Sequence, residues 1–384
     1  MLTKLIIRNS FRHKLRTALT IVGLAVAVMA FGLIRTVVDA WYAGVEASAP
    51  DRLITRSSIS ITFTLPLSYK EQIEKIDGIK QVTYANWFGG TYVDANNFFA
   101  QFAVERENYF KVFPEFIITP EAMDAFNSNI KAVIVGQKLA DRFGWKIGDR
   151  VTLIGTIYPG DWDFDVVGIY KGKDQTIDES TWFMRWDYID ETMKQQMPGR
   201  AGEIGWYGLQ LADPNRAAEV SAAVDARFKK SSAETLTETE KAFQMSFVAM
   251  SGAILVLLTV MSWLIIGVIL MVLINTMAMT ARERTSEYAF MKSMGFQGYH
   301  LWGMISGEAI IISLSGGILG LGLLAMMVNV MRAGLSAWFP VFKIQPLTWI
   351  LVVALAVAIG LISSAFPVLR AMRTRIVDGL RVVD

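Results

Sequence analysis

Residues 279–298 read MTARERTSEYAFMKSMGFQG, a short charged segment between two long apolar runs. Residues 242–281 contain no Asp, Glu, Lys, Arg or His, and residues 309–331 contain none either. Each run exceeds the roughly 18 to 20 apolar residues that a helix needs to cross a bilayer core. The charged segment is therefore predicted to turn the chain around at one membrane face, and it is too short to form a domain.

A helical pattern runs through this segment. Ala281, Thr285, Tyr288 and Met291 recur at three- and four-residue spacing, and Gly295 supplies a stop signal. The pattern favours a short amphipathic helix parallel to the membrane. Periodicity leaves one alternative open, a solvated loop whose charges only keep it out of lipid.

The same segment resembles a known motif. RER at 282–284, Glu287 and MKSMG at 291–295 are similar to the coupling helix of ABC-transporter permeases of the MacB/FtsX family. In that family the coupling helix docks into a cleft of a cytoplasmic ATPase. The resemblance implies that eight residues couple this chain to such an ATPase: Arg282, Glu283, Arg284, Glu287, Met291, Lys292, Met294 and Gly295.

The composition indicates a protein that is partly in the membrane and partly in water. Of 384 residues, 53% are hydrophobic, too many for an ordinary soluble protein, whereas 19% are charged. A net charge of +2 gives no argument for nucleic acid as a partner. The absence of cysteine from the sequence excludes disulfides, thiolate metal sites and cysteine nucleophiles.

The predicted fold class is a membrane α-helical protein with four transmembrane helices and a mixed α/β extracytoplasmic domain inserted between helices 1 and 2. The expected order is a basic cytoplasmic or interfacial segment (1–16), a first span with its stalk (17–40), the extracytoplasmic domain (41–241), a second span with its stalk (242–278), the coupling helix (279–298), a third span (301–331), an outer turn (332–345), a fourth span (346–369) and a cytoplasmic tail (370–384).

Basic residues at both ends of the chain predict that both termini are cytoplasmic. They are Lys4, Arg8, Arg12 and Arg16 at the start, and Arg370, Arg373, Arg375 and Arg381 at the end. The first four lie on one helical stripe, which either only orients the first span or forms an interfacial helix on anionic lipid. The domain between the first two spans is then extracytoplasmic, and periplasmic in a bacterial inner membrane.

Residues 41–241 carry strand and turn signals of a water-exposed α/β domain. Strands are predicted at 52–64, 79–87, 98–104 and 206–211, and helices at 69–76 and 214–228, the last with Asp213 as its N-cap. We expect these pieces to form one sheet with helices on one face. Residues 234–245 contain no Pro or Gly and are expected to continue as a helix into the second span.

The middle of this domain, about residues 106–200, is expected to interrupt the sheet as an inserted subdomain. A strand at 131–136, a helix at 137–143, a turn into a strand at 148–153 and a further segment at 164–170 are predicted there. Their order resembles the inserted subdomain of the MacB-type periplasmic region.

The third span contains an acidic residue and a glycine-rich run. Glu308 would cost on the order of 2.5 to 3.5 kcal/mol in lipid, so it should face protein or the cytoplasmic interface. Its role is either a coupling or gating contact or a structural hydrogen bond. Gly316, Gly317 and Gly320 permit close helix packing, against another helix or a symmetry mate.

Several catalytic signatures are absent from the sequence. It has no G-x-x-x-x-G-K-[ST] loop for nucleotide phosphates and no Gly-x-Ser-x-Gly nucleophile motif. His13 and His300 have no neighbours at metal-binding spacing. We therefore expect a chain that is not an enzyme and holds no cofactor, with ATP and magnesium bound by a separate ATPase.

The resemblance implies the permease subunit of an ABC transporter that uses ATP-driven motion, or mechanotransmission, to export or extract an amphipathic or lipidic substrate. Its implied partners are two ATPase copies, a second copy of the chain or a related permease, membrane lipid and a periplasmic adaptor. The alternative is an FtsX-like signalling permease that transports nothing and activates an extracytoplasmic partner such as a cell-wall hydrolase.

Overall fold

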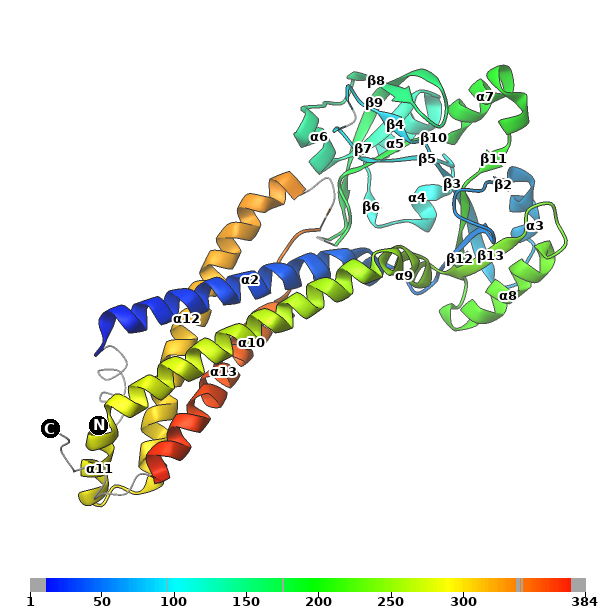
Figure 1. Cartoon of the computed structure of the whole chain (residues 1–384). Coiled ribbons are helices and arrows are strands. Elements are labelled where there is room, and N and C mark those ends of the chain that lie inside the picture. The colour runs from blue at the N-terminus through cyan, green and yellow to red at the C-terminus, as the bar shows by residue number, and fades with distance from the viewer. Residues whose placement is uncertain (1–11, 95, 175, 336–338, 340, 374–384) are drawn as a thin grey trace. The chain divides into compact units, whose positions relative to one another are not determined.

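A computed structural model describes residues 12–94, 96–174, 176–335, 339 and 341–373 of the chain (Figure 1). The chain divides into two compact units. The helical unit comprises residues 1–40, 252–334 and 342–384, and the α/β unit comprises residues 41–251 and 335–341. Of the basic stripe predicted at the N-terminus, Lys4 and Arg8 lie outside the described residues, as do Arg375 and Arg381 near the C-terminus.

Four long apolar helices satisfy the length and hydropathy of membrane spans within the described part of the chain. They are α2 (Lys14–Ala47), α10 (Gly252–Glu283), α12 (Gly298–Leu335) and α13 (Pro346–Arg373). The short helix α11 (Thr285–Ser293) lies between α10 and α12 in sequence. The predicted fold class is therefore confirmed for its helical part.

Glycines set how closely α12 packs against its neighbours in the helical unit. A Cβ atom on Gly316 would lie 2.3 Å from a methyl of Leu24 on α2, and one on Gly317 would lie 3.0 Å from the Cβ of Ala356 on α13. One on Gly320 would lie 2.7 Å from the backbone oxygen of Ala25. The three glycines therefore face two different helices of the same chain.

Replacing Gly320 by leucine is expected to lower the stability of the helical unit. The side chain would have to displace the backbone of α2, and overpacking of this kind costs about 1–3 kcal/mol. Thermal unfolding of the full chain in detergent measures the effect. The matched control is Gly322→Leu, where a Cβ would meet no described atom within 4 Å. Equal melting temperatures for the two variants would contradict the close approach of α2 and α12.

The α/β unit is built on one 11-stranded sheet, in the order β13-β1-β12-β3-β5-β10-β7-β9-β8-β4, with β6 paired to β9. The strands are β1 (Arg52–Ser57), β3 (Ile79–Trp87), β4 (Gly90–Thr91), β5 (Ala100–Val104), β6 (Phe116–Ile117), β7 (Ala132–Gly136), β8 (Arg150–Gly155), β9 (Gly160–Gly172), β10 (Thr181–Arg185), β12 (Trp206–Leu211) and β13 (Thr235–Thr239). Pairing is antiparallel except for β5 with β10 and β7 with β9, which are parallel. Strands β2 (Leu65–Pro66) and β11 (Glu203–Ile204) form a separate pair.

Helices cover both faces of the sheet, so the prediction of helices on one face was wrong. The first face packs on α3 (Lys70–Ile73), α6 (Gln137–Phe143), α7 (Trp186–Gln196) and α8 (Ala217–Phe228), and the second on α4 (Tyr109–Val112), α5 (Pro120–Ser128) and α9 (Glu240–Met250). Neighbouring residues of a strand lie in different cores: Leu53 and Ile54 of β1, and Val133 and Ile134 of β7. Strands that are apolar on both sides need cover on both sides.

Three short 3-10 turns complete the unit: η1 (Leu67–Tyr69), η2 (Pro198–Arg200) and η3 (Pro214–Arg216). Asp213, the predicted N-cap, accepts a hydrogen bond from the backbone N–H of Asn215 at 2.9 Å. The predicted helix at 214–228 therefore begins as η3 and continues as α8. The expected strand at 52–64 ends at Ser57, and residues 58–64 form a loop.

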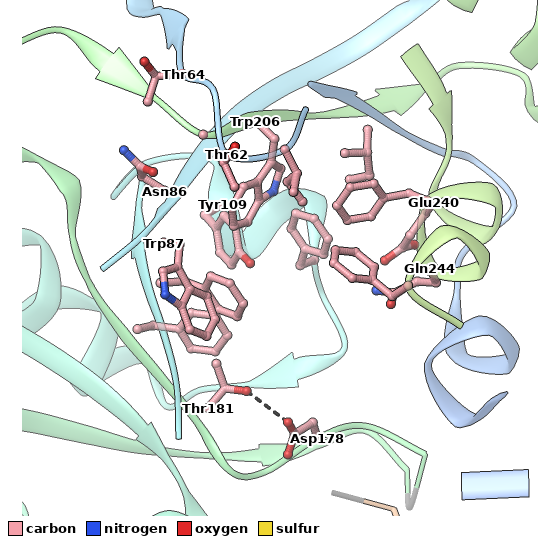
Figure 2. A pocket seen from close by; sticks show the side chains of 18 of the residues that line it. Thr62, Thr64, Asn86, Trp87, Tyr109, Asp178, Thr181, Trp206, Glu240 and Gln244 are labelled. Carbon is pink, nitrogen blue, oxygen red and sulfur yellow. Dashed lines mark hydrogen bonds between the residues drawn. The ribbon is translucent and has the colours of Figure 1, made fainter. Parts of the chain in front are cut away.

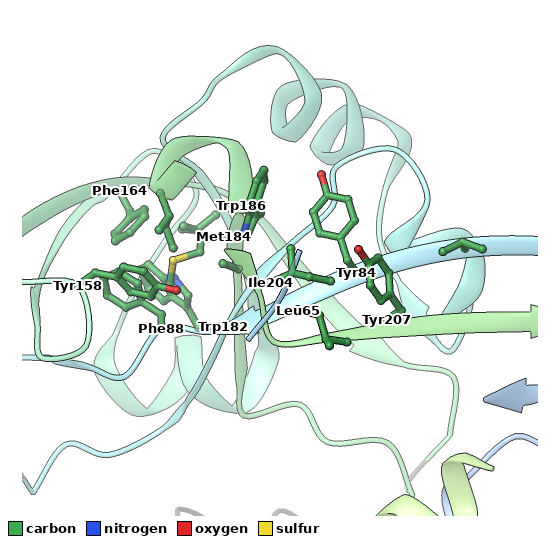
Figure 3. Packing of buried hydrophobic residues seen from close by; sticks show 14 of the residues in the cluster. Leu65, Tyr84, Phe88, Tyr158, Phe164, Trp182, Met184, Trp186, Ile204 and Tyr207 are labelled. Carbon is green, nitrogen blue, oxygen red and sulfur yellow. The ribbon is translucent and has the colours of Figure 1, made fainter. Parts of the chain in front are cut away.

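The middle portion, residues 106–200, continues the sheet instead of interrupting it. Strand β10 pairs in parallel with β5 from the preceding part of the chain, with Phe183 opposite Phe102. Strands β7, β9 and β8 then follow β10 in the sheet. Aromatic side chains fill the first-face core, and Figure 3 shows Phe88, Tyr158, Phe164 and Trp182 packed together there. Phe88 stacks on Tyr158 at a centroid distance of 5.8 Å.

Residues 234–245 do not form one helix, contrary to expectation. Residues 235–239 are strand β13, which pairs with β1 at the sheet edge, and α9 begins only at Glu240. Helix α9 then ends at Met250, the backbone N–H of the capping residue Ser251 bonds to the oxygen of Val248, and α10 begins at Gly252. The β-branched threonines of TLTET favour the strand. Thr235 and Thr237 are buried on the sheet, where their hydroxyls donate to Asp225 at 2.9 and 2.8 Å, and Leu236 is exposed.

Candidate functional site

The predicted coupling residues occupy the junction between α10 and α11. Arg282 and Glu283 belong to the last turn of α10, and Arg284 separates it from α11. The single amphipathic helix expected over this stretch is therefore split at Arg284. Gly295 adopts a left-handed backbone with φ of 91°, and its N–H bonds to the oxygen of Lys292. A glycine accommodates this conformation without the steric cost of a side chain, which explains the stop signal.

Arg284 lies buried at the centre of this junction. Its Nη1 donates to Glu308 of α12 at 2.9 Å, and its Nε donates to Glu287 of α11 at 2.9 Å. Arg284 is 7% exposed and Glu308 is 5% exposed. One guanidinium therefore joins α11 to the membrane-spanning helix α12, and it supplies the protein contact that Glu308 requires.

Two residues near the N-terminus bind the acidic groups of the junction. Arg16 of α2 donates to both carboxylate oxygens of Glu283, at 2.8 and 2.9 Å, and Arg12 pairs with Glu287. Burial raises the pKa of Glu287, but hydrogen bonds from Arg284 and Arg12 outweigh it and hold that pKa below its ordinary value. Glu287 is therefore ionised at neutral pH and stays paired with both arginines.

The remaining predicted coupling residues divide into packed and exposed groups. Met291 packs partly against the core of the helical unit, and the Nζ of Lys292 donates to the backbone oxygen of Met372 at 2.8 Å. Met294 is 56% exposed. Two further exposed side chains, Phe290 and Phe296, lie on the same short segment and were not singled out from the sequence. The exposed surface of the segment is therefore mixed, with three apolar side chains between residues 290 and 296 among exposed polar ones.

A second buried ion-pair cluster lies in the α/β unit. Arg52 of β1 donates to both oxygens of Glu115, at 2.8 and 3.0 Å, and through Nε to Glu240 of α9 at 2.8 Å. Its guanidinium also lies 4.2 Å from the centre of the Phe113 ring. Arg52 is only 2% exposed. One arginine therefore fastens the first turn of α9 to the sheet.

Glu240 has an additional partner that joins two distant parts of the chain. Its Oε2 accepts the backbone N–H of Ala49 at 2.9 Å as well as the Nε of Arg52. Burial raises the pKa of Glu240, and the charge of Arg52 opposes that rise. Residue 49 follows the end of α2, and Glu240 begins α9, so one carboxylate holds together the chain's entry to the sheet and its exit.

Sequence reasoning identified Arg284 and Glu308 but did not pair them, and it missed the cluster around Arg52. Glu308 offered a signal, because an acidic residue in an apolar span requires a cation at the same depth. Arg52 offered none, since a single arginine in a strand reads as a surface residue. The partners Glu115 and Glu240 lie 63 and 188 residues away in sequence.

No group of three or more potential metal ligands occurs among the described residues. The Nε2 of His13 lies 3.7 Å from a carboxylate oxygen of Glu283. The ring of His300 lies against those of Tyr299 and Phe296. The site is thus made of ion pairs and apolar side chains.

Two family models match the sequence and together span most of it. Residues 17–227 match the MacB-like periplasmic core domain, and residues 259–376 match the FtsX-like permease C-terminal model. An uncharacterised ABC transporter permease of Methanocaldococcus jannaschii is 22% identical over 397 residues, which cover 97% of this chain and 96% of that protein.

Solved structures of extracytoplasmic domains resemble part of the chain. The periplasmic region of MacB from Actinobacillus actinomycetemcomitans is 13% identical with a TM-score of 0.38, covering 53% of this chain and 95% of that one. The extracellular domain of the transporter YknZ from Gram-positive bacteria is 13% identical with a TM-score of 0.36, covering 49% of this chain and 98% of that one.

Proposed function

Because the chain belongs to the MacB/FtsX family of ABC-transporter permeases, we propose that it converts ATP-driven motion into work on an amphipathic or lipidic substrate. It is a membrane protein with four spans and an extracytoplasmic α/β domain. In the proposal, ATP drives the closure of a separate ATPase, and this closure moves residues 282–295. The spans carry that motion to the extracytoplasmic domain, which extracts or expels the substrate.

The observation that carries this proposal is the buried pair between Arg284 and Glu308. A surface loop that moved independently of the spans could not transmit force to them. Here the coupling segment is joined to α12 through Arg284, at 2.9 Å from Glu308, and to α2 through Arg16 and Glu283. Movement of the segment would therefore displace two spans together.

The geometry supports two different roles for the predicted coupling residues. Arg284, Glu283 and Glu287 are bound within the chain, so we assign them to positioning the segment. The exposed apolar side chains of Phe290, Met294 and Phe296 are assigned to docking in the ATPase cleft. We further propose a cytoplasmic-membrane location with both termini and this segment in the cytoplasm, and an assembly of two chains with two ATPase copies, which bind ATP and magnesium.

Replacing Met294 by aspartate is expected to weaken ATPase binding by about tenfold or more, as for a contact residue near the centre of an interface. The side chain is exposed, so the fold should persist. The measurement is co-purification of the tagged chain in mild detergent, with ATP hydrolysis as the readout. Ile147→Asp, at a 64% exposed position of the extracytoplasmic domain, is the control and should retain the ATPase. Full retention by Met294→Asp would contradict the docking assignment.

A charge exchange separates positioning from docking for the acidic residues. Glu283→Arg alone breaks the pair with Arg16 and should reduce ATPase recovery. Glu283→Arg combined with Arg16→Glu restores an intramolecular pair and is expected to restore recovery. If the exchanged chain folds but binds no ATPase, Glu283 itself contacts the ATPase, and the positioning role is wrong.

A sample that hydrolyses ATP and co-purifies with a cell-wall hydrolase, without any ATP-dependent change in bound amphiphile, would favour signalling over extraction. An ATP-dependent change in bound amphiphile would favour extraction. Both results are consistent with the proposed role of the coupling segment. They differ only in what the extracytoplasmic domain acts upon.

A further inference from the structure

The extracytoplasmic domain encloses a cavity of about 640 Å³ on the second face of its sheet. Its walls include residues of the sheet, α4, α9 and the loop 58–64, and ten of the lining residues are aromatic. Figure 2 shows Trp87, Tyr109 and Trp206 on one side of the cavity, and Glu240 and Gln244 of α9 on the other. Protein cores are close-packed, and clefts of roughly 300–1,000 Å³ are typical of small-molecule sites.

Three polar atoms on these aromatic walls have no hydrogen-bond partner among the described residues: the hydroxyl of Tyr109 and the indole N–H groups of Trp87 and Trp206. Tyr109 is only 5% exposed. A buried tyrosine usually finds such a partner for its hydroxyl, whereas Trp87 and Trp206 are half-buried. The hydroxyl of Tyr109, with two indole N–H groups on the same walls, therefore points to a ligand that carries acceptor atoms.

Other tryptophans of the same domain show the contrast. Trp162 donates to the backbone oxygen of Tyr158 at 3.0 Å, and Trp186 donates to that of Glu203 at 3.2 Å. Trp145 donates to the hydroxyl of Tyr92 at 3.3 Å. Trp182, which lies in the first-face core and not at the cavity, is the exception, since its indole nitrogen lacks a partner. The cavity walls carry two tryptophans whose indole N–H groups lack a protein partner among the described residues.

The charges around the cavity cancel formally. Glu115, Glu240 and Asp178 line it together with Arg200. Arg52 lies behind Glu115 and Glu240 and pairs with both, and the charge of Lys138 acts on Asp178. A carboxylate or phosphate in this apolar space would find no net positive charge and would pay a desolvation cost. An uncharged polar group avoids that cost.

We propose that this cavity binds an uncharged acyl ester of the monoacylglycerol type, with its hydrocarbon chain against the aromatic walls and its oxygens accepting from Tyr109, Trp87 and Trp206. The inference deepens the proposed function, on which it rests for the site's role in the transport cycle, by naming the class of amphiphile. Binding itself requires no ATPase.

The test uses photoactivatable oleoyl probes with a diazirine in the chain, added to the full chain in lipid nanodiscs without ATPase. Three probes share the chain and differ in the head: 1-monooleoylglycerol, oleic acid and a headless octadecene. We expect cross-links from the ester on peptides that contain Trp87, Tyr109 or Trp206, and at least about fivefold fewer from the acid. Cross-links confined to the membrane spans, or equal labelling by the acid, would overturn the proposal.

Two variants make the assignment specific. Tyr109→Phe removes one donor and keeps the ring, so ester labelling should fall about fivefold, as for loss of one hydrogen bond, whereas headless-probe labelling should not change. Gln244→Trp places a large side chain from α9 in the cavity and should abolish labelling. Met245→Trp changes the next residue, which is exposed, and should leave labelling unchanged. Unchanged ester labelling in Tyr109→Phe would overturn the donor assignment, even if Gln244→Trp fails to fold.

The two proposals fail in different ways. Loss of cavity labelling in a chain that still recovers its ATPase would reject the ligand site and leave the coupling proposal intact. Cavity labelling in a chain that recovers no ATPase would retain the ligand site and reject the coupling.

Discussion

Replacing Arg284 by methionine is expected to destabilise the helical unit by about 3–5 kcal/mol, the usual cost of leaving one partner of a buried ion pair uncompensated. Glu308 would keep its carboxylate inside a membrane-spanning helix after losing the donor that lies 2.9 Å away. Glu287 would also lose the hydrogen bond that it accepts from the Nε of Arg284. Thermal unfolding in detergent should show a lower midpoint, and ATPase recovery should fall because α11 is no longer joined to α12.

Arg282 provides the matched control for this experiment. It lies two residues earlier and is exposed, so Arg282→Met should leave the midpoint nearly unchanged. The double variant Arg284→Met with Glu308→Leu removes both charges and should recover much of the lost stability, because an apolar pair can replace a buried ion pair. The role of Arg284 would be refuted if Arg284→Met unfolded at the same temperature as Arg282→Met.

Replacing Arg52 by methionine is expected to have an effect of similar size on the extracytoplasmic domain, about 3–5 kcal/mol. The change removes the cation that lies between Glu115 and Glu240 and leaves two buried carboxylates near each other. Urea unfolding of the full chain, followed by tryptophan fluorescence, should show the loss, since Trp182 and Trp186 are buried in this domain. Limited proteolysis should then cut near the start of α9.

Arg56 is the control on the same strand. It pairs with Glu238 at 3.0 Å, but both side chains are partly exposed, so Arg56→Met should cost at most about 1 kcal/mol. The stability loss of Arg52→Lys should fall between those of Arg52→Met and Arg56→Met. The lysine ammonium keeps the charge but cannot reproduce the guanidinium fork that binds both carboxylates. An Arg52→Met chain as stable as Arg56→Met would show that the cluster contributes little.

Hydropathy and local capping signals predicted most of the elements from the sequence. Uncharged runs predicted the four spans, Gly295 predicted the end of the coupling segment, and Asp213 predicted the start of a helix. These features depend on residues close together in the chain. Strand 79–87 was predicted with its observed bounds for the same reason, because its pattern is local.

The sequence could not predict features that depend on distant partners. Helix α10 extends through Arg282 to Glu283, whose partner Arg16 lies 267 residues away in sequence. Strand β13 lies beside β1 although residues such as Thr55 and Thr237 are 182 positions apart. Strands at the centre of the sheet are covered by helices on both faces. The order of the strands in the sheet cannot be predicted from the residues of any single segment.

The hydrogen bond between the carboxylate of Glu240 and the N–H of Ala49, 2.9 Å long, also bears on modularity. Because it brings together residues 191 positions apart, the intervening chain forms a cassette whose two ends meet at one point. Such a cassette can be exchanged between relatives by recombination at its ends without lengthening either connecting segment. The same geometry favours producing residues 41–251, which include α9, as a separate recombinant module.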